Sequence, residues 1–418
     1  MRGAPLTAAM SVCLVLAILP LAAFPALIPT FTAEWRISNT QAGWISGIYF
    51  FGYMATVPFL MSATDRVDAR WVYFGGTALS AAATFAFAWL VHDFWSALVL
   101  RTIAGIGLAG TYMPGLKVLT DRITGNVSRA VAAYTACFSV GSGFSFLLAG
   151  SVSDASGWRL AFVACALGPL AALALTAALL RARPTPTTRS SIGLLAGFRQ
   201  ALGNRAVVGY ILAYSTHNFE ALAMRGWVVS LLVFAAARTD AQGFPWSPTE
   251  IATALTVLGL PGTILGNELA MRIGRNRAII FIMLTSAGFS AAVAGATDAP
   301  YWLLVTLVLL HGMSIPADAG AIVAGTVDAA ASEVQGASLA LQASAGFGAS
   351  FLGPLVVGVV LDHTGGAASA IAWRWAFLSI AGFACLGPFA IRLAKRRVSG
   401  AQPAVKCRCR DGGYRRRA

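Results

Sequence analysis

Apolar segments long enough to cross a bilayer alternate with short polar stretches along the whole chain. A helix needs about 20 apolar residues to span the hydrocarbon core of a membrane. Twelve segments meet that length, and in chain order they are Leu6–Thr30, Ala42–Met61, Trp71–Val91, Trp95–Leu119, Ala130–Val152, Arg159–Leu180, Ala206–Ala235, Thr249–Met271, Ala278–Ala296, Tyr301–Gly325, Gly336–Leu361 and Trp373–Ile391. The pattern predicts an all-α polytopic membrane protein with twelve transmembrane helices.

A polar stretch rich in Arg, Pro, Thr and Ser, Arg181–Arg205, divides these segments into two groups of six. Such a composition is typical of a flexible, water-exposed connector. We therefore expect an N-terminal six-helix bundle over residues 1–181 and a cytoplasmic linker over 182–205. A second six-helix bundle over 206–392 and a disordered basic cytoplasmic tail over 393–418 complete the prediction.

The composition excludes a soluble protein, since 57% of the residues are hydrophobic, 11% are charged and the mean hydropathy is +0.72. A net charge of +14 is compatible with nucleic-acid binding, but the basic residues gather at segment ends and in the tail. With the N-terminus inside, the outer loops receive only four cations, Arg36, Arg159, Arg238 and Arg374. This imbalance predicts a protein of the inner or plasma membrane with both termini in the cytoplasm, and the lipid bilayer rather than nucleic acid as its partner.

Cysteines and glycine-rich motifs do not indicate a cofactor. Four of the six cysteines lie inside apolar segments, namely Cys13, Cys137, Cys165 and Cys385. Cys407 and Cys409 supply only two ligands in the basic tail, so we predict no metal site. The G-x-G-x-x-G match Gly105–Gly110 lies within an apolar segment, where small residues favour helix packing over nucleotide binding.

The two halves repeat one another. The segment Gly150–Phe162 recurs as Gly358–Phe377, with Asp154 matching Asp362 and the Trp-Arg pairs in equivalent places. A second pair of similar segments, Thr64–Arg70 and Met271–Arg277, follows the second span of each half. Many secondary transporters are built from such repeats, with the substrate site between the halves near the midplane of the membrane.

These repeats carry a family resemblance. TDRVDAR and MRIGRNR resemble the D-R-x-G-R loop signature of the major facilitator superfamily, and RTIAGIG, from Arg101 to Gly107, resembles its fourth-span R-x-x-x-G-x-G pattern. The resemblance covers the whole chain and implies two pseudo-symmetric bundles that work by alternating access. It also implies an inner gate, to which we assign Asp65, Arg66, Arg70, Asp121, Arg272, Arg275 and Asp328. Asp68 departs from the signature, which usually has glycine there.

Titratable side chains inside the spans are the candidates for proton coupling, because each is costly in hydrocarbon unless it faces a cavity or a partner. His217 falls near the bilayer centre, and Glu220 lies on the same helix face. His311 has a similar depth in the tenth span, and Asp318 follows it. An imidazole beside a carboxylate is suited to relay protons. The alternative is that His217 and Glu220 merely satisfy each other as a buried pair.

Cationic and aromatic side chains are the candidates for substrate binding. Arg101 and Arg225 lie deep in the fourth and seventh spans and favour an anionic substrate, since a desolvated anion needs fixed positive charge. A structural role in helix packing is the alternative for Arg101. Tyr49 and Tyr53 of the second span are predicted to line the pathway opposite Tyr112.

The sequence thus predicts a monomeric secondary transporter, proton-coupled, for a small organic and anionic solute. One alternative is a proton-driven efflux pump for hydrophobic or cationic compounds, in which Glu220 or Asp318 recognises the cation. A remoter alternative is a membrane sensor that does not transport, although the only tail is short. We do not predict an enzyme, because no nucleophile or metal constellation is recognisable.

Overall fold

The computed structural model describes residues 3–123, 126–182, 194–239, 241 and 243–395. The predicted disordered tail was placed over 393–418, but Leu393–Lys395 end helix α18, and the rest of the tail, with Cys407 and Cys409, lies outside the described residues. The first part of the chain forms α1 Ala4–Ala17, α2 Ala23–Ala26, α3 Ile28–Trp35, α4 Asn39–Ala63, α5 Ala69–Leu90, α6 Phe94–Arg122, α7 Val127–Ser156, α8 Trp158–Leu179 and α9 Leu194–Gly203. The second forms α10 Arg205–Arg238, α11 Pro248–Val257, α12 Gly259–Ile273, α13 Arg275–Gly295, α14 Tyr301–Ser314, η1 Ile315–Asp318, α15 Ala319–Ala329, η2 Ser332–Val334, α16 Gln335–His363, α17 Ala370–Ala384 and α18 Leu386–Lys395. No strand occurs among the described residues.

Eleven of the twelve predicted spans are apolar helical stretches long enough to cross a membrane, within the part of the chain that the structure describes. The first span is instead broken into α1, α2 and α3, with turns between Ile18 and Ala22. Pro20 lies in this break, where it has no N–H to continue the helix. The twelve-span helical architecture is confirmed, with the first crossing interrupted.

Three spans of the second half are also interrupted. The eighth changes from α11 to α12 at Leu258, and the twelfth from α17 to α18 at Cys385. The tenth passes from α14 through the 3₁₀ turn η1, which contains Pro316, into α15. The sequence predicted each of these as one continuous helix. A broken helix inside a bilayer exposes backbone groups, and such groups are tolerated where protein surrounds them or a cavity is lined.

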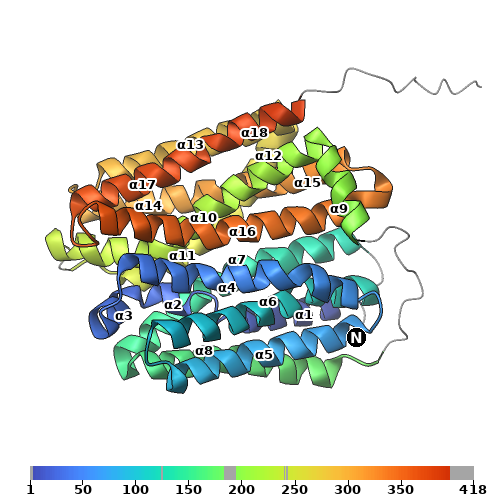
Figure 1. The fold of residues 1–418 in the computed structure, drawn as a ribbon, viewed down its shortest axis with the longest axis horizontal. Coiled ribbons are helices and arrows are strands. Elements are labelled where there is room, and N and C mark those ends of the chain that lie inside the picture. The colour runs from blue at the N-terminus through green and yellow to red at the C-terminus, as the bar shows by residue number, and fades with distance from the viewer. Residues whose placement is uncertain (1–2, 124–125, 183–193, 240, 242, 396–418) are drawn as a thin grey trace, which may run out of the picture.

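The helices form two groups that lie side by side in Figure 1, α1–α8 in one and α10–α18 in the other. The groups meet where α4 packs along α16 and α7 packs along α11. The described chain ends, near Gly3 and Lys395, lie at the same end of the molecule as α9. We call this the terminus end and the other the far end.

The two groups share a core and approach each other closely at the far end. The largest cluster of buried apolar side chains draws on both groups, with Phe31 and Phe87 from one and Trp227 and Trp373 from the other. Backbone meets backbone across the interface: a Cβ added at Gly47 would lie 2.3 Å from the Phe351 carbonyl oxygen. Glycine is therefore required where α4 crosses α16.

Candidate functional site

Four titratable side chains form two acid–imidazole pairs between α10 and the broken tenth span. His217 Nδ1 lies 2.7 Å from Asp318 Oδ1, and His311 Nε2 lies 2.9 Å from Glu220 Oε1. His217 and Glu220 come from α10, His311 from α14 and Asp318 from η1. The structure thus brings together all four residues predicted for proton coupling. His217 and Glu220 do not pair with each other, because each has its partner on the tenth span.

The Glu220–His311 pair extends into a chain of hydrogen bonds. Ser286 of α13 donates its hydroxyl to Glu220 Oε1 at 2.7 Å. Ser314, the last residue of α14, donates to the Ser286 hydroxyl at 3.2 Å. Neither serine was predicted, since a serine in an apolar span is common and only the tertiary contact reveals its role.

The two histidines differ in accessibility, whereas the side chains of Asp318 and Glu220 are both buried, at 3% and 4% exposed. The side chains of His311 and Glu220 are 0% and 4% exposed, whereas that of His217 is 10% exposed and stacks on Tyr214 with ring centroids 5.9 Å apart. His311 Nδ1 has no hydrogen-bond partner among the described residues. A second proton on that imidazole would create a buried N–H without an acceptor, which is costly. The His311 ring therefore makes its polar contact through Nε2 alone among the described residues.

Arg225 is half-buried in α10 and has no hydrogen bond or ion pair with any described residue. Its positive charge acts on His217, eight residues earlier on the same helix. Leu222, three residues before it and on the same helix face, packs against buried clusters of both halves. Arg225 therefore lies near the face of α10 that carries Leu222, and its guanidinium has no polar partner among the described residues.

Arg101 is 2% exposed, and its guanidinium is occupied by backbone. It donates to the carbonyl oxygens of Pro20 and Leu21, each at 3.1 Å, and lies 4.3 Å from the ring centroid of Tyr49. Ser145 of α7 donates to the neighbouring Leu19 carbonyl. These donors satisfy the carbonyls that the break in the first span releases. The bonds of Arg101 favour the structural alternative for this residue, and substrate contact there stays a prediction.

The predicted tyrosines lie in the interior of the first half. Tyr49 and Tyr53 are 0% exposed, and their hydroxyls have no hydrogen-bond partner among the described residues. Tyr53 contacts Phe347 across the interface with ring centroids 3.9 Å apart. Tyr112 stacks on Tyr134, whose hydroxyl donates to the Tyr112 carbonyl. Tyr53 and Tyr112 carry free hydroxyls near the boundary between the halves.

The predicted gate residues of the first half lie at the terminus end. The acidic side chain that pairs with Arg70 is Asp68, which was not among the predicted gate residues. Asp68 caps the start of α5 and lies 2.8 Å from Arg122 Nη2 and 3.4 Å from Arg70 Nε. Asp65 and Arg66 are exposed in the turn before it. Asp121 contacts Lys117 at 3.4 Å, one helical turn away. Asp68 stood out in the sequence only as a departure from the signature.

The gate residues of the second half pair within that half. Arg275, at the start of α13, lies 2.7 Å from Asp328 near the end of α15. Arg272 contacts Glu268, four residues earlier on α12, at 2.8 Å. The first contact ties the ninth span to the tenth, whereas the second is an exposed pair within one helix and contributes little.

A bond between the halves at the far end was not predicted. Asp362, near the end of α16, accepts hydrogen bonds from the backbone N–H groups of Asn39 and Thr40 at 3.1 and 2.8 Å, and from the Asn39 side chain at 2.7 Å. These N–H groups begin α4, so a carboxylate of one half caps a helix of the other. The repeat had singled out Asp362 only as the equivalent of Asp154.

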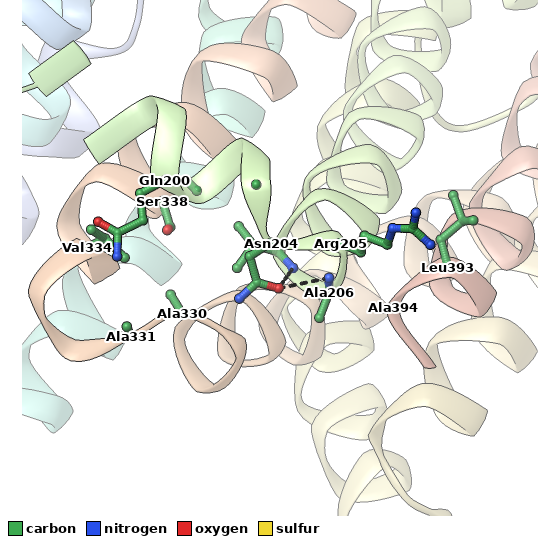
Figure 2. A pocket seen from close by; sticks show the side chains of 13 residues that line it. Gln200, Asn204, Arg205, Ala206, Ala330, Ala331, Val334, Ser338, Leu393 and Ala394 are labelled. Atoms are coloured by element: carbon green, nitrogen blue, oxygen red, sulfur yellow. Dashed lines mark hydrogen bonds between the residues drawn. The ribbon is translucent and has the colours of Figure 1, made fainter. Parts of the chain in front are cut away.

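A separate pocket of about 450 Å³ lies at the terminus end, beneath the α9–α10 junction (Figure 2). It is lined by Gln200, Asn204, Arg205 and Ser338, among others, and by none of the predicted site residues. Asn204 caps α10 here by accepting from the N–H groups of Ala206 and Val207.

Comparisons with known proteins agree with the fold. A family model described as Major Facilitator Superfamily matches residues 10–238. A protein of Haemophilus influenzae named for metabolite transport is 25% identical over 285 residues, which cover 65% of this chain and 68% of that protein.

Solved structures are similar over nearly the whole chain. A bacterial homologue of the human lysosomal transporter Spinster, in an inward-facing and unoccupied conformation, has a TM-score of 0.75 at 17% identity, covering 93% of this chain and 96% of the other. A mutant of the nucleoside transporter NupG has a TM-score of 0.80 at 13% identity, covering 94% and 100%. At these identities the likeness concerns the fold alone.

Proposed function

The chain belongs to the major facilitator superfamily, and on that premise we propose that it is a proton-coupled secondary transporter of a small organic anion. It is a multi-pass membrane transporter and not an enzyme. In the proposed mechanism two six-helix bundles rock against each other and expose a site between them to alternate sides of the membrane. The chain works as a monomer in the plasma membrane, with both termini in the cytoplasm.

The proposal of an anionic substrate rests on Arg225, whose guanidinium has no polar partner among the described residues. A cation in the interior of a membrane protein is costly unless it has a counter-charge or water. Arg101 has its backbone acceptors, and the acids nearest on α10 and η1 are taken by imidazoles. The counter-charge that Arg225 lacks is supplied by the substrate, because a carboxylate matches the two parallel N–H groups of a guanidinium.

The two acid–imidazole pairs support proton coupling. Both pairs join α10 to the tenth span next to its break at Pro316. A proton taken up by a pair changes its net charge by one unit and so changes the attraction between its partners and the contact between two spans. We therefore assign His217, the more exposed imidazole, and its partner Asp318 to proton exchange with the proposed site between the bundles, and Glu220 and His311 to a more enclosed proton site.

Uptake into proteoliposomes tests the proposal. A panel of small organic acids, amines, sugars and nucleosides is offered with and without an imposed pH gradient. We expect accumulation of one or more acids only when the gradient is present. Accumulation that persists after both the pH gradient and the membrane potential are collapsed would refute the coupling. Transport of amines, with drug resistance on overexpression, would favour the efflux alternative.

A further inference from the structure

An apolar groove of about 840 Å³ runs along the surface of the second half, lined by residues of α10, α16, α17 and α18. It arises from the break in the twelfth span. Before the break, α17 packs on α10, α13 and α16; after it, α18 stays packed on α10 and α13 but moves away from α16. Gly387 allows this turn, since a Cβ there would lie 2.3 Å from the Met283 sulfur. The helices α16 and α18 therefore enclose a groove above α10.

The groove has the chemistry and the depth of a lipid leaflet. Its walls include Leu352, which is 46% exposed, and Phe389, which is 60% exposed. Phe219 and Phe383, stacked with ring centroids 4.0 Å apart, lie at its inner limit. From Phe383 to Leu393 the chain rises about 15 Å along the helix axis. This is half of the roughly 30 Å hydrocarbon thickness of a bilayer.

Two arginines lie near the terminus end of the groove, Arg392 in its wall and Arg205 in the adjacent pocket. Arg392 lines the groove, and its guanidinium lies 5.5 Å from the ring centroid of Phe389. Leu393 borders both the groove and the pocket of Figure 2, in which the Arg205 side chain extends toward Leu393. Neither arginine has an ion pair or hydrogen bond through its side chain with any described residue. This end of the groove thus carries two positive charges without counter-charges.

We propose that the groove binds an anionic phospholipid of the leaflet at the terminus end. An acyl chain of the lipid fills the apolar groove, and its phosphate is bound by Arg205 and Arg392. A guanidinium group suits this role because two of its N–H groups can bind two phosphate oxygens at once. A second copy of the chain fits less well. A two-fold dimer with its axis along the membrane normal would bring two such cationic ends together at the same membrane level.

Native mass spectrometry of the purified, delipidated full chain tests this. Phosphatidylglycerol and phosphatidylcholine with identical acyl chains are titrated separately. We expect one phosphatidylglycerol molecule to be retained at concentrations that leave phosphatidylcholine unbound. Arg205→Ala and Arg392→Ala should each weaken this retention about fivefold, and the double variant about 30-fold, from the usual contribution of an arginine near an anionic lipid surface.

Matched variants separate the groove from general attraction between charges. Arg199→Ala removes an exposed cation of α9 that borders neither the groove nor the pocket, and should leave retention unchanged. Ala349→Trp fills the groove without changing charge and should abolish retention. Equal retention of the two lipids, unchanged binding by the double variant, displacement by millimolar inorganic phosphate, or a dimer that excludes lipid would each overturn the proposal. None of these outcomes depends on the transported substrate.

Discussion

The two halves of the molecule each contain a deep arginine and a broken helix, but they use them differently. In the first half, Arg101 donates hydrogen bonds to the carbonyls of Pro20 and Leu21, where the first span is broken. In the second half, Arg225 has no partner among the described residues, and the break in the tenth span lies between two acid–imidazole pairs. Related scaffolds therefore carry, in one half, a backbone break whose carbonyls bind an arginine and, in the other, an arginine without a polar partner among the described residues.

This difference teaches that a charge inside a membrane span indicates function only when its partners are known. Both arginines have the same signature in the sequence, a cation within an apolar segment. The bonds of Arg101 explain its presence by backbone satisfaction, which leaves little for a substrate. Arg225 has no such explanation among the described residues. We accordingly expect the transport chemistry to be concentrated in the second half.

Substitution of Arg225 should have the largest effect on transport. Arg225→Ala removes the charge that binds the anion, and we expect the affinity for the transported acid to fall by at least about 30-fold. Arg225→Lys should restore part of it, since a point charge replaces the paired donors. The unfolding temperature in detergent should not fall, because the arginine has no partner to lose. Unchanged uptake kinetics in Arg225→Ala would remove the basis for an anionic substrate.

Substitution of Arg101 should act on stability. Arg101→Ala removes two buried hydrogen bonds, leaving the Pro20 carbonyl only the N–H of Ala23 at 3.4 Å. The cost is about 3–6 kcal/mol if each bond to the charged group contributes about 1.5–3 kcal/mol. We expect a marked loss of folded protein and a lower unfolding temperature. Affinity measured on the remaining folded fraction should change little. A normal unfolding temperature together with lost binding would instead assign Arg101 to the substrate.

Neutralising the acids should uncouple transport from protons. Glu220→Gln keeps an acceptor for Ser286, and Asp318→Asn keeps one for His217, yet neither side chain titrates. For one proton per substrate, a gradient of one pH unit supports about tenfold accumulation. We expect this accumulation to disappear while exchange of labelled substrate across the membrane continues. Glu268→Gln, in an exposed pair on α12, is the control and should accumulate normally.

The span pattern predicted the fold because the cost of unpaired backbone in lipid leaves few alternatives to a continuous apolar helix. The breaks could not be predicted in the same way. Pro58 and Pro114 lie inside continuous helices, whereas Pro20 and Pro316 lie in breaks. The outcome at Pro20 depends on donors that Arg101 and Ser145 supply from other helices, and no local pattern records them.

The site was predictable in its residue types and not in its pairing. Charge inside an apolar segment singled out His217, Glu220, His311 and Asp318, since such residues are expensive there. The spacing of His217 and Glu220 suggested a pair on one helix, but both side chains reach the tenth span instead. Bonds between distant segments, such as the one that Asp362 makes, have no signature in a single sequence.

The smallest predicted effect concerns Asp362, and the sequence repeat supplies a matched control residue, Asp154. Asp362 caps α4 across the interface, whereas its equivalent Asp154 is exposed and has no partner among the described residues. Loss of one helix cap contributes about 1 kcal/mol. Asp362→Ala should therefore shift the equilibrium about fivefold toward opening of the far end, while Asp154→Ala should shift nothing.

Chemical labelling of a cysteine introduced at the buried interface measures this shift. Thr249 of α11 packs against Gly150 across the interface and is 9% exposed, so Thr249→Cys reports on separation of the halves. In a background without other cysteines, a water-soluble maleimide should label this site about fivefold faster when Asp362 is replaced by alanine, following the same cap energy. Equal rates for the Asp362→Ala and Asp154→Ala variants would mean that the packing of α4 on α16, and not the carboxylate, holds the far end closed.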